Sequence, residues 1–387
     1  MAEIQEPKSS TFDTSQVVEV APQLTTSEAS QLQVLERVES GSVSQPSASV
    51  LRIGNNIFLG TLNADTINGT TRGDIISSLE GDDTVFGQAG NDTISGGGGS
   101  DYLEGNVGRD IIYGDYTPSG NADLIASGND TIKGGDGNDL LYGQDGDDII
   151  SGDLGSDYAE GGAGNDTIDG GSGNDILYGD DIENNPGVSG NDIISGGIGS
   201  DNIDGGRGND ILNGDAGIDS LFGGQGNDTL DGGTGSDILV GTDTAFFGQL
   251  QNGFGFGEVD TLIGGRNNDT FVLGLGDANA RDVNGNNTVV FDVVLYNDGN
   301  VNANGDLDYA LIKDFGSLND GTNRGLDRVQ LAGSQSMYSL GTFANTTISG
   351  AGIFLTLGQA VPELIGVLEG ISLANINLSN TNQFIFV

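Results

Sequence analysis

The segment GGAGNDTID at residues 161–169 is one copy of a nine-residue repeat that dominates this chain. Glycine stands at its first and fourth positions, aspartate at its sixth and an apolar residue at its eighth, and the pattern returns thirteen times between Gly87 and Val240. A short fixed period predicts stacked units, because one unit is too small to bury a core alone. Most positions are turn-forming or acidic, and only one is reliably apolar. Hydrophobic burial alone therefore does not hold the stack together, and the pattern indicates a bound cation.

The composition of the chain fits a cation-binding protein and excludes several other classes. The 387 residues include 69 glycines and carry a net charge of −45, with only 12 lysines and arginines. Such a chain repels itself until its charge is neutralised, and it lacks the basic surface that nucleic acid requires, so no nucleic-acid partner is expected. The absence of Cys and His excludes disulfides, soft-metal sites and Ser-His-Asp or Cys-His catalysis. No apolar run is long enough to predict a transmembrane segment.

The chain divides into three parts by composition and period. Residues 1–50 are rich in Ser, Thr, Gln and Glu and are expected to form a disordered polar leader. Residues 51–272 hold the repeats, interrupted by three insertions. Residues 273–387 lose the nine-residue period and alternate apolar runs with turn residues, which predicts a β-rich C-terminal cap.

The three insertions follow Gly114, Gly179 and Gly241 and lie six repeats apart each time. We interpret this spacing as a duplicated six-repeat block; the alternative is two independent insertions that happen to be evenly spaced. Because repeats alternate between the two sides of the stack, all three insertions should leave the same edge, three coils or about 14 Å apart. They are either tolerated surface loops or a partner-binding face. The candidate contact residues are Tyr116, Pro118, Pro186, Phe246 and Phe247.

The repeat itself predicts one short strand and one turn. In residues 167–169, Ile168 should point inward while Thr167 and Asp169 point outward. Two repeats close one coil of eighteen residues, which places Asp148 and Asp166 in one column. Such a column repels itself unless a cation occupies it. Calcium takes six or more oxygens from carboxylates and carbonyls, glycine-rich turns are expected to free such carbonyls, and magnesium suits an all-protein cage poorly.

This nonapeptide resembles the calcium-binding, hemolysin-type repeat of the RTX (repeats-in-toxin) family, over residues 60–272. The resemblance implies an all-β fold, a right-handed parallel β-roll or β-solenoid that binds multiple Ca²⁺ ions. The pattern departs at Asn63 and Asn267, which replace the fourth glycine, and at Ala159, where the apolar residue shrinks. By family analogy the ligands are carbonyls of the first and third positions and the sixth-position carboxylate: Gly87, Ala89, Asp92, Gly96, Gly98, Asp101, Asp110, Asp130, Gly134, Asp136, Asp139, Gly143, Asp145, Asp148, Gly152, Leu154, Asp157, Gly161, Ala163, Asp166, Gly170, Ser172, Asp175, Asp192, Gly196, Ile198, Asp201, Gly205, Arg207, Asp210, Gly214, Ala216, Asp219, Gly223, Gln225, Asp228 and Asp237.

The C-terminal segment is similar, more loosely, to the ends of many bacterial and especially cyanobacterial RTX-type proteins. The likeness lies in DYALIKDF at 308–315 and in the closing QFIFV. It implies type I secretion through an uncleaved C-terminal signal, which fits a first segment, MAEIQEPKSS, without signal-peptide layout. The alternative is that the apolar tail is simply the last strand of the cap, and both can hold together.

These observations predict a secreted, extracellular calcium-binding repeat protein that folds when it meets calcium, and not an enzyme. One alternative is an adhesin or surface-matrix protein that uses the same scaffold to bind cell-surface or matrix components. A second alternative is the remnant of a hydrolase or epimerase that relies on carboxylates alone.

Overall fold

The computed structural model describes the repeats and parts of the C-terminal segment. Those parts belong to one compact unit, residues 46–117 with 121–387. The predicted leader, apart from Val50, and the candidate contact residues of the insertions lie outside the described residues. The described ranges are 50–54, 56–115, 128–180, 189–242, 259–272, 274–275, 293–294, 309–313, 328–331, 335, 338–344, 349–355, 363–369, 371–380 and 383–386.

Each repeat forms a strand from its last three residues, as predicted. Strand β13 (Thr167–Asp169) is exposed, buried and exposed in turn, so Ile168 faces the core. Some strands extend into the next repeat, as β12 (Tyr158–Ala163) does. The chain then turns where Gly162 and Gly164 adopt left-handed φ angles of 108° and 136°, which glycine alone takes without strain.

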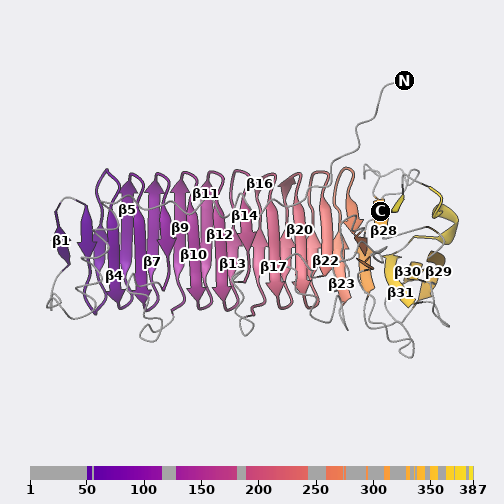
Figure 1. Cartoon of the computed structure of the whole chain (residues 1–387), viewed down its shortest axis with the longest axis horizontal. Coiled ribbons are helices and arrows are strands. Elements are labelled where there is room, and N and C mark those ends of the chain that lie inside the picture. The colour runs from indigo at the N-terminus through magenta and orange to yellow at the C-terminus, as the bar shows by residue number, and fades with distance from the viewer. Residues whose placement is uncertain are drawn as a thin grey trace, which may run out of the picture. The chain divides into compact units, whose positions relative to one another are not determined.

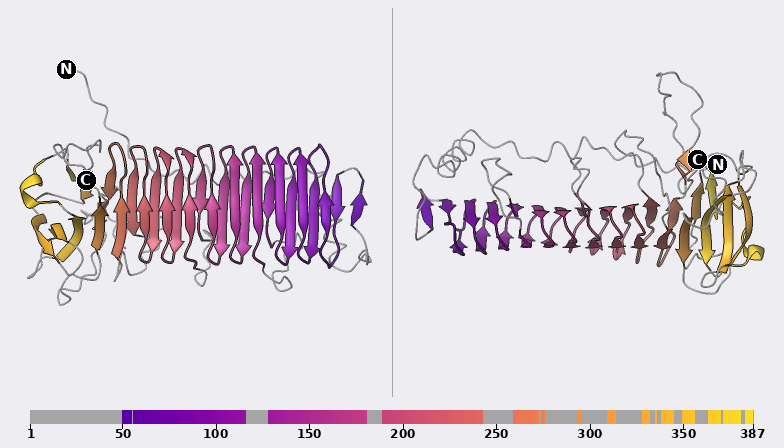
Figure 2. Two further views of the ribbon diagram at one scale, coloured as in Figure 1. Left: turned by 180° about the vertical axis from the view of Figure 1, so that it is seen from behind. Right: turned by 90° about the horizontal axis from the view of Figure 1, so that it is seen from below.

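Two repeats complete one coil, and successive coils pair in parallel. Strand β11 (Ile149–Leu154) pairs with β13, so that Ile150 lies opposite Ile168, eighteen residues later. The strands collect into two 14-stranded sheets, which Figures 1 and 2 show as two layers of the repeat region. Both predictions, the coil of two repeats and the parallel β-roll, are therefore confirmed.

Sheet A holds alternate repeats and begins with the antiparallel pair β1–β2. Its strands are, in order, β1 (Leu51–Ile53), β2 (Ile57–Leu59), β4 (Ile75–Glu80), β6 (Thr93–Gly98), β8 (Ile111–Tyr113), β10 (Leu140–Asp145), β12, β14 (Ile176–Tyr178), β17 (Asn202–Arg207), β20 (Ser220–Gln225), β22 (Ile238–Thr242), β24 (Thr270–Val272), β28 (Arg328–Leu331) and β32 (Phe384–Phe386).

Sheet B holds the other repeats and ends in an antiparallel meander. Its strands are, in order, β3 (Thr66–Asn68), β5 (Thr84–Ala89), β7 (Tyr102–Val107), β9 (Thr131–Asp136), β11, β13, β15 (Ile193–Ser195), β18 (Ile211–Asn213), β21 (Thr229–Asp231), β23 (Val259–Ile263), β27 (Tyr309–Lys313), β31 (Glu363–Glu369), β30 (Ser349–Leu355) and β29 (Tyr338–Ala344). Outside the two sheets lie the pairs β16 (Ile198–Gly199) with β19 (Ala216–Gly217) and β25 (Gly274–Leu275) with β26 (Val293–Val294), and the 3-10 turn η3 (Leu373–Asn375).

The core of the roll is a single file of apolar side chains between the two sheets. Each repeat contributes its eighth residue, and these side chains are at most 1% exposed. Because each repeat buries only one apolar side chain, other interactions must supply much of the stabilising free energy, as the sequence predicts. The file contains Ile67, Ile76, Val85, Ile94, Leu103, Ile112, Ile132, Leu141, Ile150, Ala159, Ile168, Leu177, Ile194, Ile203, Leu212, Leu221, Leu230, Leu239, Leu262 and Phe271.

The insertions leave the roll where the spacing predicts. Gly114 follows β8, Gly179 follows β14 and Gly241 lies in β22, and all three strands belong to sheet A. Neighbouring members of this set are three positions apart in the sheet, so the insertions start at one edge and three coils apart. The expected common edge is confirmed for these starting points.

Both sheets continue into the C-terminal segment without a break at residue 272. Strand β24 pairs in parallel with β28, and β23 pairs in parallel with β27. The apolar tail predicted as a last strand is β32, whose Phe384 is 1% exposed and belongs to the core. No helix in the described part of the chain is long and apolar enough to span a membrane.

Candidate calcium sites

The sixth-position aspartates form two columns, one at each turn of the coil. Nearly all are buried, with exposures of 3% or less from Asp74 onward. The first aspartate column is Asp65, Asp83, Asp101, Asp130, Asp148, Asp166, Asp192, Asp210, Asp228 and Asp260. The second aspartate column is Asp74, Asp92, Asp110, Asp139, Asp157, Asp175, Asp201, Asp219, Asp237 and Asp269.

From Asp83 onward, one carboxylate oxygen of each aspartate accepts a main-chain N–H from the preceding coil. The main-chain N–H of Asp148 donates to Oδ1 of Asp166 at 2.8 Å, and the same bond repeats from coil to coil. The bond also crosses the insertions, since Asp101 N donates to Asp130 Oδ1 and Asp166 N donates to Asp192 Oδ1, both at 2.8 Å. The insertions therefore do not interrupt the columns.

The second carboxylate oxygen, Oδ2, is buried and has no hydrogen-bond partner along most of each column. A buried unpaired carboxylate oxygen is costly, because the group has lost water and gained nothing in exchange. The residues with this arrangement are Asp92, Asp101, Asp110, Asp130, Asp139, Asp148, Asp157, Asp166, Asp175, Asp192, Asp201, Asp210, Asp219 and Asp237. Their Oδ2 atoms are suitable ligands for a hard cation.

Main-chain oxygens approach the same place. A Cβ atom added to Gly161 would lie 2.4 Å from Asp166 Oδ2 and 2.6 Å from the carbonyl oxygen of Gly179 in the next coil. The first-position glycine is therefore required by close approach, and it brings a carboxylate oxygen and a carbonyl oxygen together. The other predicted first-position glycines lie against the Oδ2 of their own repeat in the same way: Gly87, Gly96, Gly134, Gly143, Gly152, Gly170, Gly196, Gly205, Gly214 and Gly223.

The third-position carbonyls are placed differently from the expectation that the turns free them. The carbonyl oxygen of Ala163 accepts the N–H of Gly146 at 2.7 Å, and that of Ser172 accepts the N–H of Gly155 at 2.8 Å. Since a carbonyl has two lone pairs, these bonds leave one for an ion, and ligation by this position stays a prediction. A fourth-position N–H likewise donates to the carbonyl oxygens of Gly98, Asp136, Leu154, Ile198, Arg207 and Gln225.

Burial raises the pKa of most column carboxylates between Asp83 and Asp237. Desolvation is the largest cause, and hydrogen bonds from the main chain oppose it. The pKa rises to about 6 for Asp92, Asp139, Asp148 and Asp237, to about 7 for Asp83, Asp110, Asp130, Asp166, Asp175, Asp210 and Asp219, and to about 8 for Asp101, Asp157 and Asp192. At neutral pH the folded chain therefore favours either a proton or a cation at these oxygens.

The N-terminal ends of the columns are satisfied by the protein itself. Thr61 donates to Oδ2 of Asp65 from its N–H at 2.6 Å and from its hydroxyl at 2.9 Å. The N–H of Thr70 likewise donates to Oδ2 of Asp74 at 2.5 Å. In both cases the threonine stands at the second position, next to the first-position glycine. The degenerate early repeats therefore supply a hydrogen-bond donor to Oδ2, whereas the repeats from Asp92 to Asp219 do not.

The predicted departures from the repeat have different consequences. Asn267 takes the left-handed φ of the glycine it replaces, at 84°, and Asp269 remains in its column, accepting from Asp237 N at 3.0 Å. Ala159 stays in the core, 1% exposed. Within the described ranges, no group of three or more acidic side chains is placed to hold a metal ion. An ion at one level would therefore take most of its oxygens from the main chain.

The sequence-based site prediction omitted two kinds of residue that the structure places at the turns of the roll. Asp65, Asp74, Asp83, Asp260 and Asp269 extend the columns at both ends, and their place six residues into the degenerate repeats was the signal. The buried Asp115, 6% exposed, and Asp180 follow Gly114 and Gly179 at the insertions, and the repeat pattern alone gave no signal for them.

Comparison with known proteins agrees with this geometry. No curated protein matches the chain. A family model, the RTX calcium-binding nonapeptide repeat (4 copies), matches residues 59–94, 86–115, 126–159, 152–181, 186–221, 213–243 and 254–277, just over half of the chain. The gaps between these matches fall within the three insertions. By this match, which agrees with the two columns of buried aspartates, the chain belongs to the family of proteins with RTX calcium-binding nonapeptide repeats.

Proposed function

We propose that this protein is a secreted calcium-binding scaffold whose roll forms when it meets extracellular calcium. The observation that carries the proposal is the repeated, buried and unpaired Oδ2 along both aspartate columns. A single buried and unpaired carboxylate oxygen would be only an isolated defect in packing. Its recurrence at fixed register between Asp92 and Asp237 gives a series of positions that a cation would stabilise.

The energetics support coupling between calcium binding and folding. The core supplies one apolar side chain per repeat, while the chain carries a net charge of −45. Burying the columns without a cation costs free energy at every level, and a ligand that binds only the folded state stabilises it by mass action. Where calcium is scarce the chain would stay extended; where it is abundant, binding supplies the folding free energy.

This coupling suits a protein that is exported unfolded and folds outside the cell. The similarity of DYALIKDF and QFIFV to the ends of type I secreted proteins supports this route. The columns suit a structural role, so the protein acts as a scaffold and not as an enzyme.

A calcium titration followed by far-ultraviolet circular dichroism tests the central proposal. We expect a cooperative change from coil to β-structure as calcium rises, and a much weaker response to magnesium, which keeps its waters. Equal β-structure at neutral pH in a calcium-free buffer would contradict the proposal.

Export needs a separate test, because the closing QFIFV is also strand β32. Deleting residues 383–387 would remove a core side chain together with any signal. The test therefore fuses residues 308–387 to an unrelated passenger protein in a host with a type I secretion system. Calcium-independent appearance of the fusion in the medium is the expected result, and retention in the cells would refute the C-terminal signal.

A further inference from the structure

The first two insertions interrupt turns whose hydrogen bonds are otherwise uniform. In an uninterrupted turn, the fourth-position N–H donates to the third-position carbonyl of the next coil, as Gly155 N does to Ser172 O at 2.8 Å. The third-position N–H donates back to the second-position carbonyl, as Ser172 N does to Asp153 O at 2.9 Å. An insertion between the second and fourth positions separates the residues that make these bonds.

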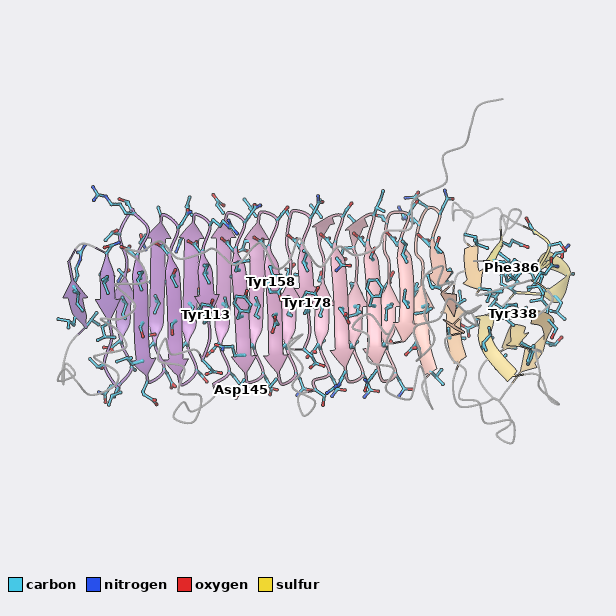
Figure 3. The ribbon with its side chains drawn as sticks, viewed as in Figure 1. Tyr113, Asp145, Tyr158, Tyr178, Tyr338 and Phe386 are labelled. Carbon is cyan, nitrogen blue, oxygen red and sulfur yellow. The ribbon has the colours of Figure 1, made fainter. Side chains whose placement is uncertain are left out.

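At the first insertion the side chain of Asp115 takes over these bonds. Gly128, where the repeat resumes, donates its N–H to Asp115 Oδ1 at 3.0 Å. Asp145, the third-position residue of the next coil, donates its N–H to Asp115 Oδ2 at 3.1 Å. Figure 3 shows Asp145 at the edge of the roll, away from the tyrosines in the middle of the strands. One carboxylate therefore joins the two ends of the interrupted turn to the coil beyond it.

The second insertion has the same side-chain bridge and also keeps one bond of the ordinary turn, since the N–H of Gly190 still donates to the carbonyl oxygen of Arg207 at 3.1 Å. Gly190 donates its N–H to Asp180 Oδ1 at 3.1 Å, and Arg207 donates its N–H to Asp180 Oδ2 at 2.5 Å. Asp180 stands at the second repeat position, as Asp115 does, and its partners again hold the fourth position and the third position of the next coil. At the third insertion this position is Thr242.

The bridged turn also borders an aspartate level. A Cβ atom on Gly114, the residue before Asp115, would lie 2.2 Å from Asp130 Oδ2, which has no hydrogen-bond partner. A Cβ atom on Gly179, before Asp180, would lie 2.3 Å from Asp192 Oδ2. A shift of either turn would therefore move the main chain away from a predicted calcium level.

We propose that Asp115 and Asp180 are positioning residues that bridge the interrupted turns, so that the calcium levels at Asp130 and Asp192 keep their geometry although a loop leaves beside them. The carboxylate does this because its two oxygens accept one N–H from each side of the break. The proposal deepens the proposed function, since it rests on calcium binding by the columns. It also implies that the insertions can be shortened, because residues on either side of the break supply the bridge.

The variant Asp115→Asn tests this role, with Asp153→Asn as its matched control. An amide keeps one accepting oxygen, so either the Gly128 or the Asp145 N–H loses its partner. Asp153 occupies the same second position in an uninterrupted turn, where its side chain bonds only Ser151 at 3.0 Å among the described contacts. A third chain replaces residues 116–127 by one alanine, which restores the nine-residue period as GDAGND.

We expect Asp115→Asn to raise the calcium midpoint about tenfold, the scale of one buried unsatisfied N–H. Amide hydrogen exchange should quicken in peptides containing Gly128 and Asp145. Asp153→Asn should change neither quantity, and in the shortened chain Asp115→Asn should have no effect, because an ordinary turn has replaced the bridge.

Two results would overturn the proposal. An effect of Asp115→Asn no larger than that of Asp153→Asn would show that no bridge exists. An undiminished effect in the shortened chain would identify Asp115 as a direct calcium ligand instead. The hydrogen-exchange comparison is made on the folded chain, so it still reports on the bridge if the parent chain proves to fold without calcium.

Discussion

At the residue scale, neighbouring positions of one repeat have separate tasks. In β18 the burial pattern is exposed, buried and partly buried, so Leu212 fills the core while Ile211 beside it is 44% exposed. The sixth-position aspartate uses one oxygen to join coils and leaves the other for a cation. These separate tasks allow each contribution to be removed alone.

Leu212→Ala should destabilise the calcium-bound roll by about 2–5 kcal/mol, because it opens a cavity in a core one residue wide. Ile211→Ala should cost less than about 1 kcal/mol, since that side chain is partly exposed and its loss opens no cavity in the core. Denaturant unfolding at saturating calcium measures both values. Similar losses for the two variants would mean that the file of eighth residues is not the core.

Asp166→Asn should remove a calcium level while keeping the column hydrogen bond, because the amide oxygen can still accept the N–H of Asp148. Asp147→Asn is the control. Asp147 is exposed and holds the fifth repeat position, where the next coil already has an asparagine, Asn165. There Asn165 N and Nδ2 donate to Asp147 Oδ1 at 2.8 and 3.0 Å. Equilibrium dialysis should find fewer ions bound by Asp166→Asn, and an unchanged number would mean that this position holds no ion.

At the element scale, the coil of two repeats is the unit that fixes which side each segment occupies. Asn129 and Asn191 follow the first two insertions at the same repeat position. Hydrogen bonds between successive coils link them through Asp147 and Asn165, along one side of the roll. They are therefore three coils apart, or about 14 Å.

Deleting a whole coil should leave Asn129 and Asn191 on the same side of the roll, and deleting half a coil should place them on opposite sides. Removal of residues 152–169, eighteen residues, should bring Asn129 and Asn191 to two coils apart on the same side. Removal of residues 161–169, nine residues, should place them on opposite sides. The chain has no cysteine, so spin labels on cysteines introduced at the two positions report the separation directly. Stronger spin–spin broadening after the nine-residue deletion than after the eighteen-residue one would contradict the two-repeat coil.

At the scale of the whole molecule, the columns make stability depend on pH and calcium together. The aspartate pKa values of about 6 to 8 in the folded chain exceed the unfolded value of about 3.9. Between these values the folded state binds more protons than the unfolded state, so its stability falls as pH rises. Protonation and calcium binding thus relieve the same buried charge.

Without calcium, the roll should be most stable near pH 4 and should unfold as pH rises through about 6 to 8. With saturating calcium, it should stay folded across this window, and binding near pH 6.5 should release protons. Circular dichroism in calcium-free buffer, and calorimetry in buffers of different ionisation enthalpy, measure the two effects. A calcium-free chain that gains β-structure as pH rises would contradict this reasoning.

The nine-residue period by itself determined much of this fold. The position of Ile168 in the core, the pairing of Asp148 with Asp166 and the common edge of the insertions all follow from side-chain alternation and a coil of two repeats. Periodicity is local information repeated many times, so a single sequence is enough to read it.

Only the tertiary structure decided where the pattern is broken. The satisfaction of Asp65 by Thr61, the hydrogen bonds on third-position carbonyls such as that of Ala163, and the bridging role of Asp115 depend on which groups meet across coils. The continuation of both sheets into β27 and β28 likewise joins residues far apart in the chain. The sequence repeats the strand and the turn, but a hydrogen bond between coils needs two segments in contact, and only folding brings those together.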